Sequence, residues 1–156
     1  MDGARWLDGQ EATMWRALQE GWTAMDGALE RQLSESGLSA ADYALLVPLS
    51  EADGDLLRAR ELAGRVGWER SRLSHQLRRM EQRGLVQRSE CTEDARGTMI
   101  ELTPEGRALV EHVAPGHVDA VRRHLVDLLE PGEAEVITAV FQRVRDAARP
   151  ASDGCG

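Results

Sequence analysis

The chain has 156 residues, 42% of them hydrophobic, and a formal net charge of −8. A chain of this length and composition can bury a substantial core, which excludes a wholly disordered protein. Its two cysteines, Cys91 and Cys155, are too few for a disulfide framework or a four-cysteine zinc site. The N-terminus lacks the apolar segment of a signal peptide, and the longest apolar run, 43–47, is too short to cross a bilayer. We therefore expect a cytoplasmic protein without membrane contact.

The charge is distributed unevenly along the chain. The segment from Arg58 to Arg88 contains nine arginines and three acids, a balance of +6, and the other residues carry −14. One basic segment within an acidic chain is typical of a surface that contacts nucleic acid.

The first half of the sequence predicts four helices. Residues 10–34 form a long helix whose narrow apolar stripe suits a partner helix. Ser39 caps a second helix that extends to about Glu51 and ends at the turn 53–55. A short helix over 59–66 and a tight turn at 67–68 precede a helix over about 69–83. The stripe of the first helix consists of Trp15, Leu18, Trp22, Met25 and Leu29.

The helix over 69–83 has two chemically different faces. Leu73, Leu77 and Met80 share one side, which we expect to be buried. Gly84 has the place of a C-terminal helix cap. At 100° per residue, the opposite face carries Ser71, His75, Arg78, Arg79 and Gln82.

The second half of the sequence predicts two strands and two further helices. Residues 85–88 and 98–102 form a hairpin around a polar loop. Thr103 and Pro104 start a helix that extends to about Leu129, and Pro115-Gly116 is expected to kink or split it. A last helix begins at Pro131. The side chains expected to face inward from these two helices are Val110, Val113, Val118, Val121, Leu125 and Leu128, then Val136, Val140, Phe141 and Val144.

The predicted order is therefore α-α-α-α-β-β-α-α, a mainly α fold with a small β-hairpin wing after a helix-turn-helix. Three short motifs follow the polar-faced helix in order: Arg83-Gly84-Leu85-Val86, Asp94-Ala95-Arg96 and Leu102-Thr103-Pro104-Glu105-Gly106-Arg107. With these motifs the chain resembles the MarR family of winged helix-turn-helix transcriptional regulators. It departs from the family pattern at Glu69, where a serine or threonine usually caps the recognition helix.

The resemblance implies a DNA-binding regulator, expected to be a repressor, that binds a pseudo-palindromic operator as a homodimer. Residues 1–36 and 108–150 would form the helical dimerisation domain, 37–107 the DNA-binding domain and 151–156 a flexible tail. A ligand in such proteins binds between the two domains and releases the DNA. No cofactor is implied.

The expected DNA contacts follow from the two faces of the helix and from the wing. Side chains on the polar face point toward base edges or phosphates, and the resemblance places the wing arginine, Arg96, in the minor groove. Asp94 would hold an arginine side chain or a loop amide and fix the wing. We expect base-edge contacts from Ser71, His75 and Arg78, phosphate contacts from Arg72, Arg79 and Arg88, and a further contact from Ser74.

The ligand and metal expectations rest on fewer residues. Trp15, Tyr43 and His117 are candidates for the pocket of a small aromatic or phenolic ligand. The spacings of His112, His117 and His124 do not match the i, i+4 arrangement of two zinc ligands on one helix, so no metal site is expected. An alternative sensor is Cys91, whose thiol could respond to oxidants with Arg88 lowering its pKa.

An enzyme and a protein-binding adaptor are the two alternatives to a DNA-binding regulator. The sequence lacks the G-x-S-x-G, G-x-x-x-x-G-K, H-E-x-x-H and C-x-x-C signatures, so we do not expect an enzyme. A winged-helix adaptor that binds protein remains an alternative, although it needs no cationic recognition helix. Retention on heparin or on random duplex DNA at low salt separates a DNA-binding protein from both.

Overall fold

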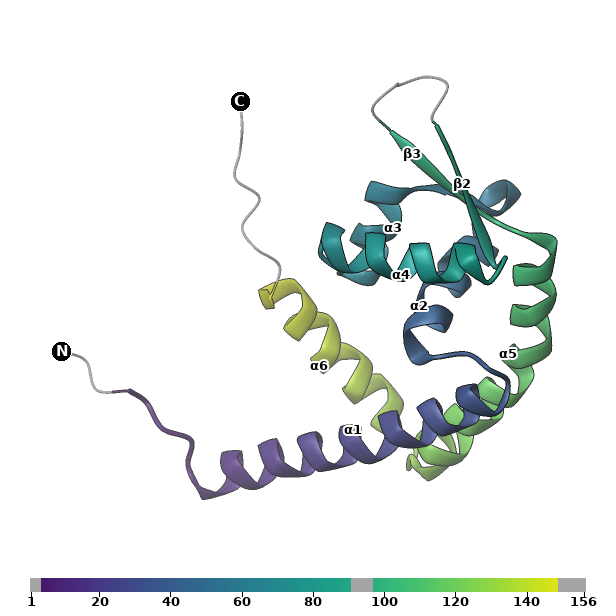
Figure 1. Ribbon diagram of the computed structural model, residues 1–156. Coiled ribbons are helices and arrows are strands. Elements are labelled where there is room, and N and C mark those ends of the chain that lie inside the picture. The colour runs from purple at the N-terminus through teal and green to yellow at the C-terminus, as the bar shows by residue number, and fades with distance from the viewer. Residues whose placement is uncertain (1–3, 91–96, 149–156) are drawn as a thin grey trace. The chain divides into compact units, whose positions relative to one another are not determined.

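A computed structural model describes residues 4–90 and 97–148 of the chain (Figure 1). The described residues divide between two compact units, one up to Ala120 and one from Val121. The mainly helical fold with a small β-hairpin is confirmed. In chain order the elements are α1 (Gly9–Glu35), α2 (Ala40–Ser50), a 3-10 turn (Asp53–Asp55), β1 (Leu56–Arg58), α3 (Ala59–Val66), α4 (Arg70–Gln82), β2 (Val86–Glu90), β3 (Thr98–Leu102), α5 (Pro104–His124), a 3-10 turn (Val126–Leu128) and α6 (Glu133–Ala148).

Short polar side chains define where the first two helices begin. Asp8 and Glu11 form a reciprocal capping box at the start of α1. Ser39 and Asp42 form the same arrangement at α2, where the Asp42 N–H donates to Ser39 Oγ at 3.1 Å and the Ser39 N–H to Asp42 Oδ2 at 2.9 Å. Each box satisfies backbone N–H groups that a helix leaves unpaired. The predicted cap at Ser39 is confirmed.

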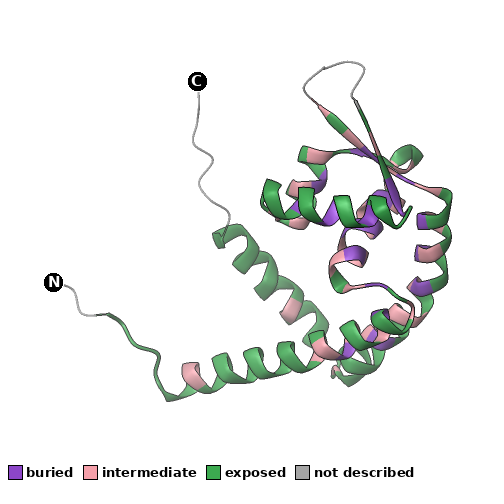
Figure 2. Cartoon of the chain, viewed as in Figure 1, coloured by how far each residue is buried: buried purple, intermediate pink, exposed green. Residues whose placement is uncertain are grey.

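The core of the first unit lies between α2, α3, α4 and the sheet (Figure 2). Leu45, Leu46, Leu49 and Leu62 are 0% exposed. As predicted, the buried side of α4 presents its aliphatic side chains to this core, and the polar face on the other side is exposed. The buried side chains of α4 are Leu73, Gln76, Leu77 and Met80.

The hairpin belongs to a three-stranded antiparallel sheet in the order β1-β3-β2. Leu57 of β1 pairs with Ile100 of β3, which also pairs with Arg88 of β2. Strand β1 was not predicted from the sequence, because three residues are too few to show an alternating pattern. This strand depends on its partner about forty residues later and not on local propensity.

Two of the sequence motifs pack directly against each other. The Thr103 hydroxyl donates to the carbonyl oxygen of Gly84 at 2.6 Å and accepts from the Gly106 N–H at 3.0 Å. A Cβ atom on Gly106 would collide with the carbonyl oxygen of Leu85. These contacts join the end of the α4 region to the start of α5, which explains why the two motifs occur together.

Helix α5 differs from the prediction at its C-terminal end, since it ends at His124 and not near Leu129. Of the kink or split expected at Pro115, the split does not occur, because the helix is continuous there. Pro115 removes one helical hydrogen bond. Packing on both sides of the proline stabilises the helix against this loss, since Val113 and Ala120 are each 1% exposed.

Several apolar side chains expected to face inward are exposed in the single chain. Val118 is 54% exposed, Leu125 37% and Leu128 69%, and α6 has no buried residue. The hydrophobic period predicts an amphipathic helix but not which molecule covers its apolar face. Across the described parts of the chain, no helix is long and apolar enough to span a membrane.

Candidate nucleic-acid interface

The polar face of α4 is the most strongly cationic surface of the helix-turn-helix. The structure places the six predicted contact residues of this helix in exposed positions, and Ser74 also lines a cavity with Leu73 and Leu77. A row of guanidinium, imidazole and hydroxyl groups on one exposed helix face can contact phosphates and base edges. These six residues are Ser71, Arg72, Ser74, His75, Arg78 and Arg79.

Most arginines of this region are not neutralised by acids. Arg65 pairs with Glu61 at 2.7 Å and Arg83 with Asp42 at 2.7 Å. Among the described residues, no acid forms a salt bridge with the arginines on the exposed side of α4 or with the second residue of α3. Their charge is therefore available to an external anion. These arginines are Arg60, Arg70, Arg72, Arg78 and Arg79.

Arg72 is held in place by an aromatic ring. Its guanidinium carbon lies 4.1 Å from the centroid of the Trp68 ring, a cation–π contact. Trp68 lies in the turn before α4, four residues before Arg72, and is half-buried. The contact orients the Arg72 side chain before any ligand arrives. This role of Trp68 was not predicted from the sequence, although its spacing of four residues from Arg72 was a usable signal.

Arg88 has a different environment from the one expected for a phosphate contact. Its Nε donates to Oε2 of Glu81 at 3.0 Å, and its Nη2 lies 3.0 Å from the same oxygen in a salt bridge. Glu81 is the one acid within the sequence of α4. A phosphate must therefore compete with Glu81 for the Arg88 guanidinium.

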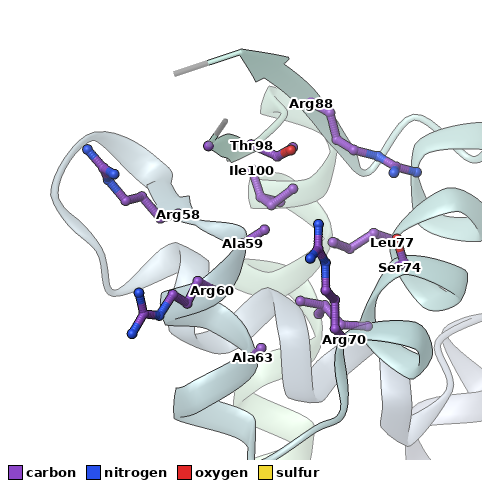
Figure 3. Close-up of a pocket in the computed structure, with 12 residues that line it drawn as sticks. Arg58, Ala59, Arg60, Ala63, Arg70, Ser74, Leu77, Arg88, Thr98 and Ile100 are labelled. Carbon is purple, nitrogen blue, oxygen red and sulfur yellow. The ribbon is translucent and has the colours of Figure 1, made fainter. Parts of the chain in front are cut away.

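A cavity of about 510 Å³ lies between α3, α4 and the sheet. Figure 3 shows Arg70 extending from α4 toward Thr98 and Ile100, whereas Arg58 and Arg60 point outward on the far side. Aliphatic side chains line the cavity between these cations. The arginines around it extend the cationic surface from α4 to the base of the hairpin. The arginines are Arg58, Arg60, Arg70 and Arg88, and the aliphatic residues include Ala63, Leu73, Leu77 and Ile100.

Three candidate site residues, and the tail 151–156, lie outside the described residues. Asp94 and Arg96, expected in the wing, belong to the segment 91–96, as does Cys91, the alternative redox sensor. Within the described part, no group of three metal-ligating side chains could hold a metal ion.

The structure brings together two of the three candidate ligand residues. The rings of Tyr43 in α2 and His117 in α5 have centroids 4.4 Å apart. Gln32 of α1 lies beside them, because a Cβ on Gly116 would lie 3.1 Å from its amide nitrogen. Trp15 is 47% exposed and lies seventeen residues before Gln32, roughly 25 Å along α1. One chain therefore does not unite Trp15 with the other two.

Burial changes the ionisation of both rings. It raises the pKa of the Tyr43 phenol, with a further contribution from the negative charge of Glu51. It lowers the pKa of His117, because the imidazolium loses hydration. His117 Nδ1 and Gln32 Oε1 are both buried without a hydrogen-bond partner among the described residues. The cluster is thus polar but incompletely paired.

Comparisons with known proteins agree with this geometry. Residues 38–98 match the MarR family. The HTH-type transcriptional repressor YetL of Bacillus subtilis is 30% identical over 123 residues, which are 77% of this chain and 74% of YetL.

Solved structures match nearly the whole chain. Sco3205, a MarR family transcriptional regulator from Streptomyces coelicolor solved in complex with DNA, has a TM-score of 0.93 and 38% identity, covering 98% of this chain and 97% of that one. AbsC, a MarR family transcriptional regulator from the same organism, has a TM-score of 0.90 and 39% identity, covering 92% and 97%. The winged helix, the cationic face of α4 and these similarities together show that the chain belongs to the MarR family of DNA-binding transcriptional regulators.

Proposed function

We propose that this protein is a cytoplasmic repressor that binds a pseudo-palindromic DNA operator as a homodimer and is released by a small aromatic or phenolic ligand. In this proposal residues 37–107 bind DNA, and residues 1–36 and 108–150 form the dimerisation domain. The assignment as a repressor is supported by YetL, a relative that is named a transcriptional repressor.

The cationic face of α4 is the observation that carries the proposal. Arg72, Arg78 and Arg79 are exposed there without a salt bridge to a described acid, opposite a side that the core buries. A helix of this kind is suited to the major groove, where its side chains reach base edges and phosphates. In the proposal, Ser71, His75 and Arg78 contact bases, Arg72, Arg79 and Arg88 contact phosphates, and Ser74 makes a further contact. Arg96 enters the minor groove with Asp94 holding the wing.

The exposed apolar faces of the terminal helices support a dimer. Trp15 and Trp22 of α1 are 47% and 58% exposed, and Phe141 and Val144 of α6 are 45% and 54% exposed. Faces of this kind are usually covered by another molecule. A second copy of the chain is the natural partner, because an isologous interface uses the same surface twice.

The ligand site in this proposal includes Tyr43 and His117 from one chain. Trp15 would then come from the second protomer, because one chain keeps it apart from these rings. The orphaned His117 Nδ1 offers a hydrogen bond to a phenolic hydroxyl, and the Tyr43 ring offers a stacking surface.

The proposal is tested by selecting bound sequences from a random duplex pool and mapping the protected bases. We expect two inverted half-sites whose centres are one helical turn apart, about 34–36 Å, or a multiple of it. A single unpaired half-site, or a monomer in light scattering at micromolar concentration, would contradict the proposal. A screen for small molecules that release the selected site then tests the ligand.

Variants of the interface separate base contacts from phosphate contacts. Arg78→Ala should weaken operator binding by about 1–3 kcal/mol and relax the base preference at one position. Arg96→Ala should weaken operator binding by about the same amount, and more at sites with A·T-rich flanks. Arg79→Ala should weaken operator and random duplex equally and lower the salt dependence. Arg65→Ala is the matched control, since Arg65 is exposed on α3 and paired with Glu61. Unchanged binding by Arg78→Ala would remove α4 from recognition.

A further inference from the structure

A buried polar network joins α2 to α4 behind the cationic face. Its centre is the Asp42 carboxylate, 1% exposed in the first turn of α2. Asp42 Oδ1 accepts from Gln76 Nε2 at 2.7 Å, and Oδ2 accepts from Arg83 Nη1 at 2.7 Å and from the Ser39 N–H at 2.9 Å. Burial alone would raise the pKa of Asp42, but the hydrogen bonds from Ser39 and the charge of Arg83 outweigh it and hold the pKa below its ordinary value.

The two partners in the α4 region lie on nearly the same side of the helix axis. Gln76 and Arg83 are seven residues apart, which is within about 20° of two full turns. Gln76 is buried in the middle of α4, and Arg83 is its C-terminal cap. They lie along the edge of the apolar stripe, one turn after the exposed Arg72 and Arg79 respectively. The recognition helix is therefore attached to one carboxylate at two points about 10 Å apart along its axis.

Arg83 is fixed by a second acceptor. Its Nη2 atom donates to the carbonyl oxygen of Gly37 at 2.6 Å, in the turn between α1 and α2. Gly37 has a φ of +75°, a conformation that favours glycine. A planar guanidinium held by Asp42 and by this carbonyl cannot rotate without breaking a bond. Its position relative to α2 is thus determined from two directions.

Aliphatic packing alone specifies the rotation of a helix weakly, because it is non-directional and tolerates small shifts. Recognition of base edges requires side chains held within roughly 0.5 Å and 10–20°. Charged hydrogen bonds are directional and short, so they can supply this constraint. We propose that Asp42, Gln76 and Arg83 are positioning residues that set the rotation of α4 and thereby the sequence discrimination of the protein.

This inference rests on the proposed DNA-binding function and predicts a specific separation of effects. Non-specific affinity comes from phosphate contacts and does not require an accurate helix rotation. Discrimination between base pairs does require it. Loss of the network should therefore lower affinity for the operator but leave the affinity for unrelated duplex and its salt dependence unchanged.

The test variant is Gln76→Leu, which removes one donor to Asp42 and leaves the Asp42–Arg83 pair and every charge in place. Affinities for the selected operator and for a scrambled duplex of equal length are measured at one salt concentration. We expect the ratio of these affinities to fall roughly tenfold, comparable to one mismatched base pair. Arg83→Lys, which keeps the charge but not the planar fork, should lower the ratio in the same direction.

The control is Leu49→Val, a core change two helical turns after Asp42 in α2. Leu49 is 0% exposed, so the substitution lowers stability without touching the network, and its affinity ratio should equal that of the wild type. The inference is overturned if Gln76→Leu keeps the wild-type ratio, if its two affinities fall together, or if Leu49→Val lowers the ratio equally. If the wild type itself does not prefer any duplex, the proposed function fails instead.

Discussion

The helix-turn-helix and the C-terminal helix both carry large apolar side chains but bury them to very different extents. In α2, Leu45, Leu46 and Leu49 are 0% exposed, whereas in α6 Val136 is 63% and Phe141 45% exposed. The first region completes its core with residues of its own chain. The second presents an apolar face that one chain leaves in water. The same residue types therefore stabilise the fold in one region and offer a surface for association in the other.

The largest effect is expected from a change in the completed core. Leu45→Ala should lower the free energy of unfolding by about 2–5 kcal/mol, because truncation leaves a cavity among well-packed neighbours. Since the lost contacts are within one chain, the loss should be the same at low and high protein concentration. Denaturant unfolding measured at two concentrations checks this.

The matched control for this core variant is Leu7→Ala. Leu7 is 55% exposed before α1, so its truncation should change the free energy of unfolding by no more than about 0.5 kcal/mol. Equal losses in the two variants would show that burial within the chain does not distinguish the two regions.

A change in α6 should instead act on association. Phe141→Asp places a charge in the exposed apolar stripe and should weaken the dimer by about 2 kcal/mol or more, as expected for an aromatic residue at an interface. The predicted result is a monomer in light scattering, with the helical circular dichroism signal retained and operator binding greatly reduced. Gln142→Asp, at the adjacent exposed position, should remain dimeric. A dimer that tolerates Phe141→Asp would leave the α6 stripe without its proposed role.

The sequence predicts best those features that depend on residues close together in the chain. The buried and polar faces of α4 follow from the 3.6-residue period, and the cap at Ser39 follows from a serine directly before an apolar helix. Strand β1 was missed because it forms by pairing Leu57 with Ile100, far along the chain. The inward orientation of Val118 was wrong because a periodic pattern does not identify the molecule that covers it.

The candidate nucleic-acid interface also combines features predicted from local spacing with features that depend on packing between separate elements. The exposed arginines of α4 were predicted from their angular position, which sequence spacing determines. The contacts of Arg88 with Glu81 and of Arg83 with Asp42 depend on how separate elements pack, and no local pattern contains that information. Asp42 itself was not singled out, because an acid in the first turn of a helix is common at exposed positions.

A smaller effect is expected from Glu81, the acid that forms a salt bridge with Arg88. Its removal tests whether this pairing limits the contact of Arg88 with DNA. If Arg88 exchanges Glu81 for a phosphate on binding DNA, Glu81→Gln should raise affinity for duplex DNA by less than about 1 kcal/mol, since the exposed pair is itself weak. Removing a carboxylate near the phosphates acts in the same direction, and the salt dependence should become steeper. Glu61→Gln, which removes the partner of Arg65 on α3, should change binding less. Weaker operator binding by Glu81→Gln would show that Glu81 holds Arg88 in its working position.

The smallest expected effect concerns His117, at the contact between α2 and α5. Burial lowers its pKa from the ordinary value of 6.5, and Nδ1 has no hydrogen-bond partner among the described residues. The unfolded chain therefore binds a proton near pH 6.5 that the folded chain takes up only at lower pH.

The stabilisation associated with neutral His117 is complete above about pH 6.5 and declines as the pH falls through the interval down to the folded pKa. The Tyr43 ring, 4.4 Å from that of His117, carries no charge in that interval, so it does not offset the cost of protonation. The free energy of unfolding of the wild type minus that of His117→Gln should accordingly decrease between pH 7 and pH 5. A difference that increases as the pH falls would contradict this prediction. It would mean that the folded protein stabilises the charged imidazolium of His117 relative to the neutral ring.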